Sequence, residues 1–204
     1  MRRAERRAHL LHCALEVFAE KGYHAASITD IIKRAQVARG TFYLYFEGKR
    51  AVFEELLDDT LSALHVQVKR IDPSRGPAGV LAQMEANVDG VFSTLLDNRP
   101  MLRLLLAEAV GLDAGFDQKL GEFYGRLLEL IETALEDGKQ MKLVGRAVNT
   151  PVAARCILGS IKEVLYQQAT SDEDMGRQLL VDELLRYNVR ALLVPEVAER
   201  LRTK

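Results

Sequence analysis

Several classes of protein are excluded by what this chain of 204 residues has little of. Its two cysteines, Cys13 and Cys156, are too few for a secreted domain held together by disulfide bonds. Its densest apolar run, residues 104–107, ends at Glu108 and falls short of the roughly 18 to 20 apolar residues that span a bilayer. The charged N-terminus is not followed by the apolar core of a signal peptide. We therefore expect a soluble, cytoplasmic protein that does not associate with membranes.

The chain also lacks a strong excess of charge of either sign. Its 28 Lys and Arg residues nearly balance its 29 Asp and Glu residues, which leaves a formal net charge of −1. That total excludes a protein that coats DNA over its whole surface. It hides a division, however, because residues 1–50 hold ten basic and five acidic side chains, a net charge of +5. The other 154 residues hold 18 basic and 24 acidic side chains, so a basic N-terminal quarter precedes a remainder of charge −6.

Sustained strand-like alternation is also missing, and apolar residues recur instead at every third or fourth position. Leu11, Leu15 and Phe18 line one face of a first helix. Longer series of the same kind lie in 116–134, 154–165 and 180–185. Thr150 is placed to cap one of these helices, with Pro151 as its first residue. The pattern predicts an all-α protein of about nine helices.

Two short amphipathic segments joined by a tight turn form the most specific pattern in the chain. Ser27 begins the first segment, and its hydroxyl can accept a hydrogen bond from the backbone N–H of Asp30. We expect this helix to halt at the turn 36–38 and a second short helix to follow over 39–46. Two short helices connected in this way, the second rich in hydrogen-bonding side chains, are typical of a helix-turn-helix.

The second helix has the residues expected where a helix meets a DNA duplex. Gly40 removes a side chain where the helix must come close to the duplex, and a lysine after the helix can neutralise a phosphate. Phe42 and Phe46 are four residues apart and are expected to pack inward as ordinary core. Two tyrosines beside them offer hydroxyls that a core would not select. The residues assigned to DNA on these grounds are Arg39, Gly40, Thr41, Tyr43, Tyr45 and Lys49.

The sequence TFYLYFEGK at 41–49, preceded by AQVARG at 35–40, resembles the signature of the tetracycline-repressor (TetR) family. The chain departs from that pattern at two positions. Gln36 stands where the family usually has glycine and must adopt a backbone conformation that glycine adopts freely. Ala38 stands where the family usually has serine or threonine, and it cannot cap the recognition helix, a loss on the order of 1 kcal/mol.

The resemblance implies a division of the chain into two helical domains. Residues 1–47 would form a three-helix DNA-binding domain of the helix-turn-helix type, with Ser27 among the residues that face DNA. Residues 48–204 would form a domain for ligand binding and dimerisation. Its first helix, at about 49–70, would connect the two domains, and a loop would follow at 72–79.

The resemblance also implies a function. Two recognition helices of a homodimer would bind a palindromic DNA operator, and a small effector, expected to be hydrophobic, would release the DNA. The expected function is therefore that of a ligand-responsive transcriptional repressor. The candidate residues for the effector are Asn87, Phe92, Arg103, Glu108, Phe123, Tyr124, Lys162 and Tyr166. The candidate residues for the dimer interface are Ala153, Cys156, Gly159, Ser160, Leu180, Leu184 and Asn188.

Two other interpretations remain open at the level of sequence. His9, His12 and Cys13 have a spacing that could place metal ligands on one helical surface, although no further Cys/His cluster lies near them. The chain could also be a helical interaction module whose DNA-binding part is vestigial, and a DNA-binding assay separates that alternative. The sequence has neither a nucleophile elbow nor a phosphate-binding glycine loop. We expect no enzymatic activity, no cofactor and no bound metal.

Overall fold

The structure is a computed structural model that describes residues 3–108, 114–171 and 175–192. Within these ranges the chain forms nine α-helices and no β-strand, which confirms the predicted all-α class. The helices are α1 (Arg3–Lys21), α2 (Ile28–Ala35), α3 (Arg39–Tyr43), α4 (Lys49–Gln67), α5 (Gly76–Leu96), α6 (Arg99–Arg103), α7 (Ala114–Gln140), α8 (Thr150–Thr170) and α9 (Arg177–Leu192). A 3-10 turn at Pro73–Arg75 precedes α5, and a π-helical turn at Leu104–Glu108 follows α6.

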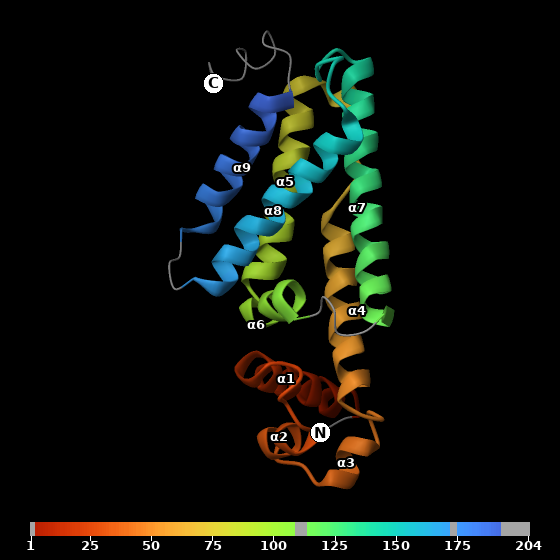
Figure 1. The fold of residues 1–204 in the computed structure, drawn as a ribbon, viewed down its shortest axis with the longest axis vertical. Coiled ribbons are helices and arrows are strands. Elements are labelled where there is room, and N and C mark those ends of the chain that lie inside the picture. The colour runs from red at the N-terminus through yellow and green to blue at the C-terminus, as the bar shows by residue number, and fades with distance from the viewer. Residues whose placement is uncertain (1–2, 109–113, 172–174, 193–204) are drawn as a thin grey trace.

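The helices are arranged along one long axis (Figure 1). Helices α1–α3 gather at one end, and we call them the head. Helices α5–α9 lie toward the other end, and we call them the body. Helix α4 rises out of the head and runs beside α7 into the body (Figure 1). Helix α6 contacts α1, so the head touches the body at a second place besides α4.

Local side-chain chemistry fixes the start of the first helix of the predicted helix-turn-helix. The hydroxyl of Ser27 accepts a hydrogen bond of 3.2 Å from the backbone N–H of Asp30, whose carboxylate accepts one of 3.0 Å from the backbone N–H of Ser27. This capping box, predicted from sequence, satisfies two N–H groups at the start of α2. Gln36 ends α2 in the left-handed region, with φ of 53°, as its glycine-like place in the turn predicts. Ala38 precedes α3 without any side-chain cap, also as predicted.

Several predicted boundaries differ from the structure by a few residues. The second helix of the motif ends at Tyr43 rather than at residue 46, and residues 44–46 continue as a turn whose backbone N–H groups still bond to residues 40–42. The connecting helix α4 ends at Gln67. The predicted loop at 72–79 is shorter, because the 3-10 turn and the first residues of α5 occupy most of it.

One predicted cap is wrong by a single residue. The side chain of Asn149 accepts the hydrogen bond from the backbone N–H of Val152 at 3.1 Å, so Asn149 and not Thr150 caps α8. The Thr150 side chain is buried, and its hydroxyl donates instead to the carboxylate of Glu136 on α7. Asparagine and threonine are both good capping residues, so their order in the sequence could not decide between them.

One buried cluster runs from the head into the body. Phe18 of α1, Phe42 of α3 and Phe53 of α4 are fully buried in the head, and the rings of Phe18 and Phe53 lie 6.0 Å apart. The same cluster continues through Leu102 of α6 to Leu165 of α8. The first turns of α4 are therefore packed into the head, while its other end reaches the body. No helix in the described ranges is both long and apolar enough to cross a membrane.

Candidate DNA-binding head and ligand cavity

Helix α3 and the turn after it have one buried side and one exposed side. Phe42 and Phe46 are buried, as predicted, and their rings lie 5.9 Å apart. On the other side, 44% of Tyr43 and 74% of Leu44 are exposed. Two aromatic anchors thus hold a helix of one and a half turns with its outer side chains open to a partner.

The exposed side of α3 combines a cation, an aromatic ring and a glycine without a side chain. The guanidinium carbon of Arg39 lies 5.7 Å from the centroid of the Tyr43 ring, so the two side chains are held together. A methyl group built onto Gly40 would meet no atom within 4 Å. Nothing inside the described protein therefore requires glycine at this position, and its absence of a side chain leaves the backbone open to close approach from outside.

The other residues assigned to DNA are less accessible. Thr41 and Tyr45 are half-buried, and Tyr45 packs against the core cluster. Ser27 is exposed, but its hydroxyl donates to the carboxylate of Asp30 at 2.7 Å and accepts from the Asp30 backbone within the capping box. These residues can still lie near a duplex, but part of their hydrogen-bonding capacity or surface is used within the protein.

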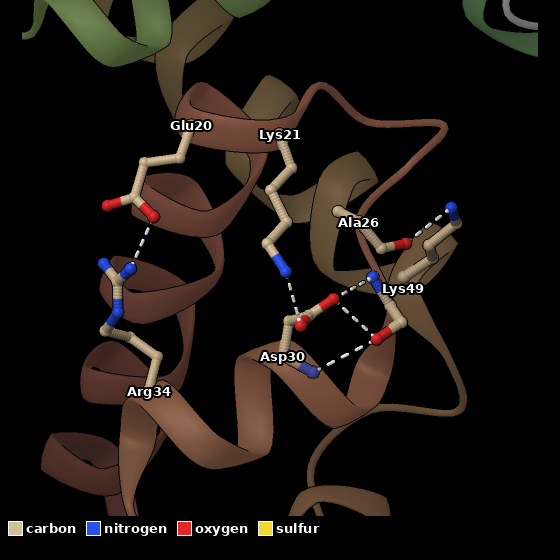
Figure 2. Close-up of polar contacts among 7 residues, drawn as sticks. Glu20, Lys21, Ala26, Asp30, Arg34 and Lys49 are labelled. Atoms are coloured by element: carbon tan, nitrogen blue, oxygen red, sulfur yellow. Dashed lines mark hydrogen bonds and ion pairs between the residues drawn. The ribbon is translucent and has the colours of Figure 1, made fainter.

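Lys49 is held by the head itself. Its ammonium group donates to the backbone carbonyls of Tyr23, His24 and Ala26, at 2.8, 3.0 and 3.0 Å. The same nitrogen lies 4.7 Å from the centroid of the Tyr23 ring. Figure 2 shows the bond to Ala26 beside the start of α2. All three N–H donors of the ammonium are occupied, and Lys49 therefore stabilises the loop between α1 and α2.

Ion pairs fix α2 against α1 (Figure 2). Lys21 donates to Asp30 at 2.6 Å, and Arg34 donates to Glu20 at 2.5 Å and to Glu16 at 3.1 Å. The hydrogen bond from Lys21, joined by those from Ser27, holds the pKa of Asp30 well below its usual range. The bond to Glu20 raises the pKa of Arg34. This network links α1 to α2, the helix that precedes α3.

A guanidinium group joins the head to α4. Arg7 of α1 donates through Nε to Glu55 of α4 at 2.7 Å, and its Nη2 donates to the second oxygen of the same carboxylate. Its Nη1 donates to the backbone carbonyl of Tyr45 at 3.2 Å, and its plane covers the Phe46 ring with 4.7 Å between guanidinium carbon and ring centroid. One side chain therefore links α1, the turn after α3 and α4.

The body contains a partly open apolar cavity of ≈ 200 Å³ between residues 68–71, just after α4, and helices α5, α7 and α8. Its wall includes Met84 and Val88 from α5 and Leu127 and Ile131 from α7. Lys69 is the charged residue among those that line it. A concave, mostly apolar space with few polar groups is the usual form of a ligand site.

Of the residues predicted to bind the effector whose side chains the structure describes, Asn87 alone lines this cavity. Its amide is already paired with the backbone of Lys69, accepting at 3.1 Å and donating at 2.7 Å. Phe92 and Phe123 are buried in the main core, and Arg103 is exposed. The side chain of Glu108 lies outside the described residues.

The remaining three predicted effector residues lie elsewhere in the body. The ammonium of Lys162 lies 4.1 Å from the centroid of the Tyr124 ring, and burial raises the pKa of that tyrosine. Lys162 and Tyr166 border a separate polar depression together with Leu106, Gly159 and Glu163. The prediction looked for polar residues that interrupt apolar faces, whereas the lining of the apolar cavity is almost entirely apolar side chains.

The residues predicted for the dimer interface divide into two groups. Leu180, Leu184 and Asn188 of α9 are buried within the chain, and the Asn188 amide donates to the Leu184 carbonyl at 2.8 Å and to the Ser160 hydroxyl at 3.3 Å. Ala153 and Ser160 of α8 are half-buried, whereas Cys156 and Gly159 are exposed. The face of α9 that the sequence pattern selected thus packs inward against the body.

Exposed apolar side chains lie on both helices. On α8, Val152 and Tyr166 are exposed and share a helical stripe with the predicted residues Cys156 and Gly159 and with the exposed Glu163. On α9, Leu179 is 51% exposed and Tyr187 is 70% exposed. We call the six residues other than Glu163 the outer α8–α9 face.

The histidines and cysteine near the N-terminus have partners within the head. The Nε2 atom of His9 lies 3.2 Å from the carbonyl oxygen of Ala35, and the sulfur of Cys13 lies 3.8 Å from that nitrogen. His12 is exposed and pairs with Glu16 at 3.5 Å. Burial raises the pKa of the Cys13 thiol. Among the residues that the structure describes, no three His, Cys, Asp or Glu side chains come together as a metal site.

Comparison with known proteins bears on both parts of the chain. Residues 10–56 match the family described as "Bacterial regulatory proteins, tetR family". The fatty acid metabolism regulator protein of Bacillus subtilis is 24% identical over 187 residues, which cover 90% of this chain and 93% of that protein.

Solved structures share the whole fold. A structure from Syntrophomonas wolfei described as a TetR-family transcriptional regulator covers 95% of this chain and is itself covered completely, with a TM-score of 0.68 and 26% identity. The transcriptional regulator FadR from Bacillus subtilis, in complex with stearoyl-CoA, covers 89% of this chain with 97% of its own length, a TM-score of 0.68 and 24% identity. The matched N-terminal segment, the full-length relative and the shared helical fold together support a transcriptional regulator of the TetR family.

Proposed function

We propose that this protein is a repressor that binds a palindromic DNA operator as a homodimer and releases it when an acyl ligand enters the body. Residues 1–47 would form the DNA-binding domain and residues 48–204 the regulatory domain. The open space at Gly40 carries the proposal, because an exposed, internally unneeded glycine beside Arg39 and Tyr43 suits the close approach of a duplex. A protein with this function would work in the cytoplasm.

The outer α8–α9 face would join two copies of the chain. Homodimer interfaces are usually built from apolar side chains that are exposed in the single chain. Large aromatic residues such as Tyr187 are enriched in them. This face lies in the body, away from α3 (Figure 1). Two heads held in this way would meet successive major grooves, whose centres are roughly 34 to 36 Å apart.

The effector would be an amphipathic molecule with an acyl chain. The cavity wall is apolar, which suits a hydrocarbon chain, and Lys69 at its border suits an anionic head group. The similar regulator solved with stearoyl-CoA adds support for this class of ligand. A space of ≈ 200 Å³ is small beside the roughly 300–1,000 Å³ of ordinary ligand sites, so helices around it would move apart on binding.

Helix α4 would carry that movement to the head. Val68, just after its last turn, lines the cavity, while Phe53 and Lys49 at its beginning are packed into the head. The Arg7 guanidinium ties α4 to the turn after α3. A shift of α4 would therefore change the position of α3 relative to the body, and thus the spacing of the two heads.

A gel shift with the DNA upstream of the protein's own gene tests the proposal at about 100 mM salt, where phosphate contacts still hold. We expect a discrete complex that acyl-coenzyme A compounds dissociate, with coenzyme A alone as the control. Arg39→Ala and Tyr43→Ala should weaken the complex without lowering the unfolding temperature. If the wild-type protein forms no complex with any fragment, the repressor function is refuted.

A further inference from the structure

Leu44 is the most exposed of the large apolar side chains in the described ranges, with 74% of its surface open. Leucine in this state contributes little to the fold, because almost none of its apolar area is removed from water. The neighbouring Phe42 and Phe46 provide the packing that anchors this segment. Leu44 is therefore available to a partner rather than to the core.

The backbone holds Leu44 in a fixed place at the end of the recognition helix. Its N–H donates to the carbonyls of Gly40 at 3.2 Å and Thr41 at 3.3 Å, and its φ and ψ of −71° and −17° are helical. Residues four apart lie on the same helical face, so Leu44 shares its face with Gly40. This face therefore has no side chain at Gly40 and an exposed apolar side chain at Leu44, and Tyr43 lies directly beside it.

The place of this surface points to DNA as the occupant. Figure 1 shows α3 at one end of the molecule, with α8 and α9 toward the other. The segment 1–50 carries a net charge of +5, which complements a polyanion. A leucine in the major groove cannot bond to a phosphate or to a polar base edge. The apolar group offered there is the C5-methyl of thymine.

We propose that Leu44 reads a thymine methyl group in each half of the operator and so helps to set its sequence. This inference rests on the proposed DNA-binding function and adds the base that one side chain selects. The contact would bury the leucine methyl groups against the thymine methyl and remove both from water. The methyl group of 5-methylcytosine has the same position on the pyrimidine ring and would satisfy the same contact.

The test begins with selection of duplexes from a random library by the full-length wild-type protein. In the selected duplex each thymine is replaced by deoxyuridine, which lacks only the methyl group, at symmetric positions of both half-sites. Affinity is measured by fluorescence anisotropy at fixed salt. We expect one position at which the wild-type protein loses about three- to fivefold in affinity per half-site, from the transfer free energy of a methyl group.

The variant Leu44→Ala decides whether that loss belongs to Leu44. It should bind the thymine and deoxyuridine duplexes equally at this position and keep the wild-type unfolding temperature. Val66→Ala, which truncates another strongly exposed apolar residue on α4, is the matched control and should behave like wild type. At the same position, cytosine should bind the wild-type protein less well than 5-methylcytosine.

The outcomes separate this inference from the function on which it rests. If the library yields no enriched sequence, the DNA-binding function itself fails. If a sequence is enriched but no methyl dependence is lost in Leu44→Ala, or Leu44→Gln selects the same sequence as wild type, then Leu44 reads no thymine and this inference alone is overturned.

Discussion

Replacing Lys49 with alanine should unfold the head more easily, rather than remove a contact to DNA alone. The side chain donates to three backbone carbonyls, and those of Tyr23 and Ala26 are partly buried. Losing a donor to a buried carbonyl costs roughly 1 kcal/mol or more. Loss of the ammonium above the Tyr23 ring costs about 0.5–1 kcal/mol. The exposed carbonyl of His24 can turn to water and adds little.

The sum is about 2–3 kcal/mol of unfolding free energy, which corresponds to a fall of roughly 5–10 °C in the unfolding temperature of a chain of this size. Thermal unfolding followed by circular dichroism, together with urea denaturation, measures both quantities. Lys49→Met keeps the aliphatic stem and should lose nearly as much, because the ammonium makes the bonds. Lys33→Ala, which removes an exposed lysine from α2 of the same head, is the control and should change the unfolding free energy by less than about 0.5 kcal/mol.

The opposite pattern would refute this reasoning. If Lys49→Ala kept the wild-type unfolding free energy but bound the operator tenfold more weakly, Lys49 would be a phosphate contact. Its three carbonyl partners would then contribute nothing measurable to the fold.

Four further predictions follow from the head, the body and the outer face. Gly40→Ala should leave stability unchanged or raise it by up to about 1 kcal/mol, because its methyl group meets open space, yet weaken operator binding in an anisotropy titration; equal operator affinity would contradict close approach at Gly40. Tyr187→Glu should give a monomer in light scattering, with Val66→Glu as the exposed control, and a dimer that persists would remove the outer α8–α9 face from the interface. Ala134→Leu should partly fill the cavity and weaken binding of an acyl-coenzyme A in calorimetry without lowering the unfolding temperature, and unchanged affinity would place the ligand elsewhere. The pKa of Asp30 is lowered by folding, so its ion pair stabilises the protein above about pH 4 and is lost as the pH falls. The difference in unfolding free energy between wild type and Asp30→Asn should therefore shrink on acidification, and a difference that grew would contradict the lowered pKa.

Much of the head could be predicted from sequence because its determinants are local. The Ser27–Asp30 capping box spans four residues, and the left-handed Gln36 follows from its place in a three-residue turn. The inward direction of Phe42 and Phe46 follows from their spacing of four. Each of these features depends on residues at most four positions apart, so it can be predicted from the sequence alone.

The partners of Lys49 could not be predicted because they are backbone groups more than twenty positions away. Every residue has a backbone carbonyl, so the sequence does not mark which carbonyls a lysine bonds to. A lysine that donates to three of them cannot be told from a lysine exposed to solvent by its sequence. The head fold brings the loop after α1 to the start of α4, and only that approach reveals the contact.

The body was harder to predict for two physical reasons. Helical spacing marks an apolar face but does not say what covers it, so Leu180 and Leu184 fitted a dimer interface as well as the intrachain packing that they make. A cavity is a space that side chains leave between helices, and no residue type encodes it. Leu127 and Ile131 were expected on one face of a long helix, but their position at the cavity wall depends on the distance to α5 and α8.

The most direct test of the proposed function is the affinity of the full-length protein for its selected palindromic duplex, measured with and without stearoyl-CoA. We predict tight binding of two chains to each duplex and a loss of at least tenfold when the acyl ligand is added, while coenzyme A alone changes nothing. Binding by single chains, or an affinity that no acyl-coenzyme A alters, would contradict the function proposed for this protein.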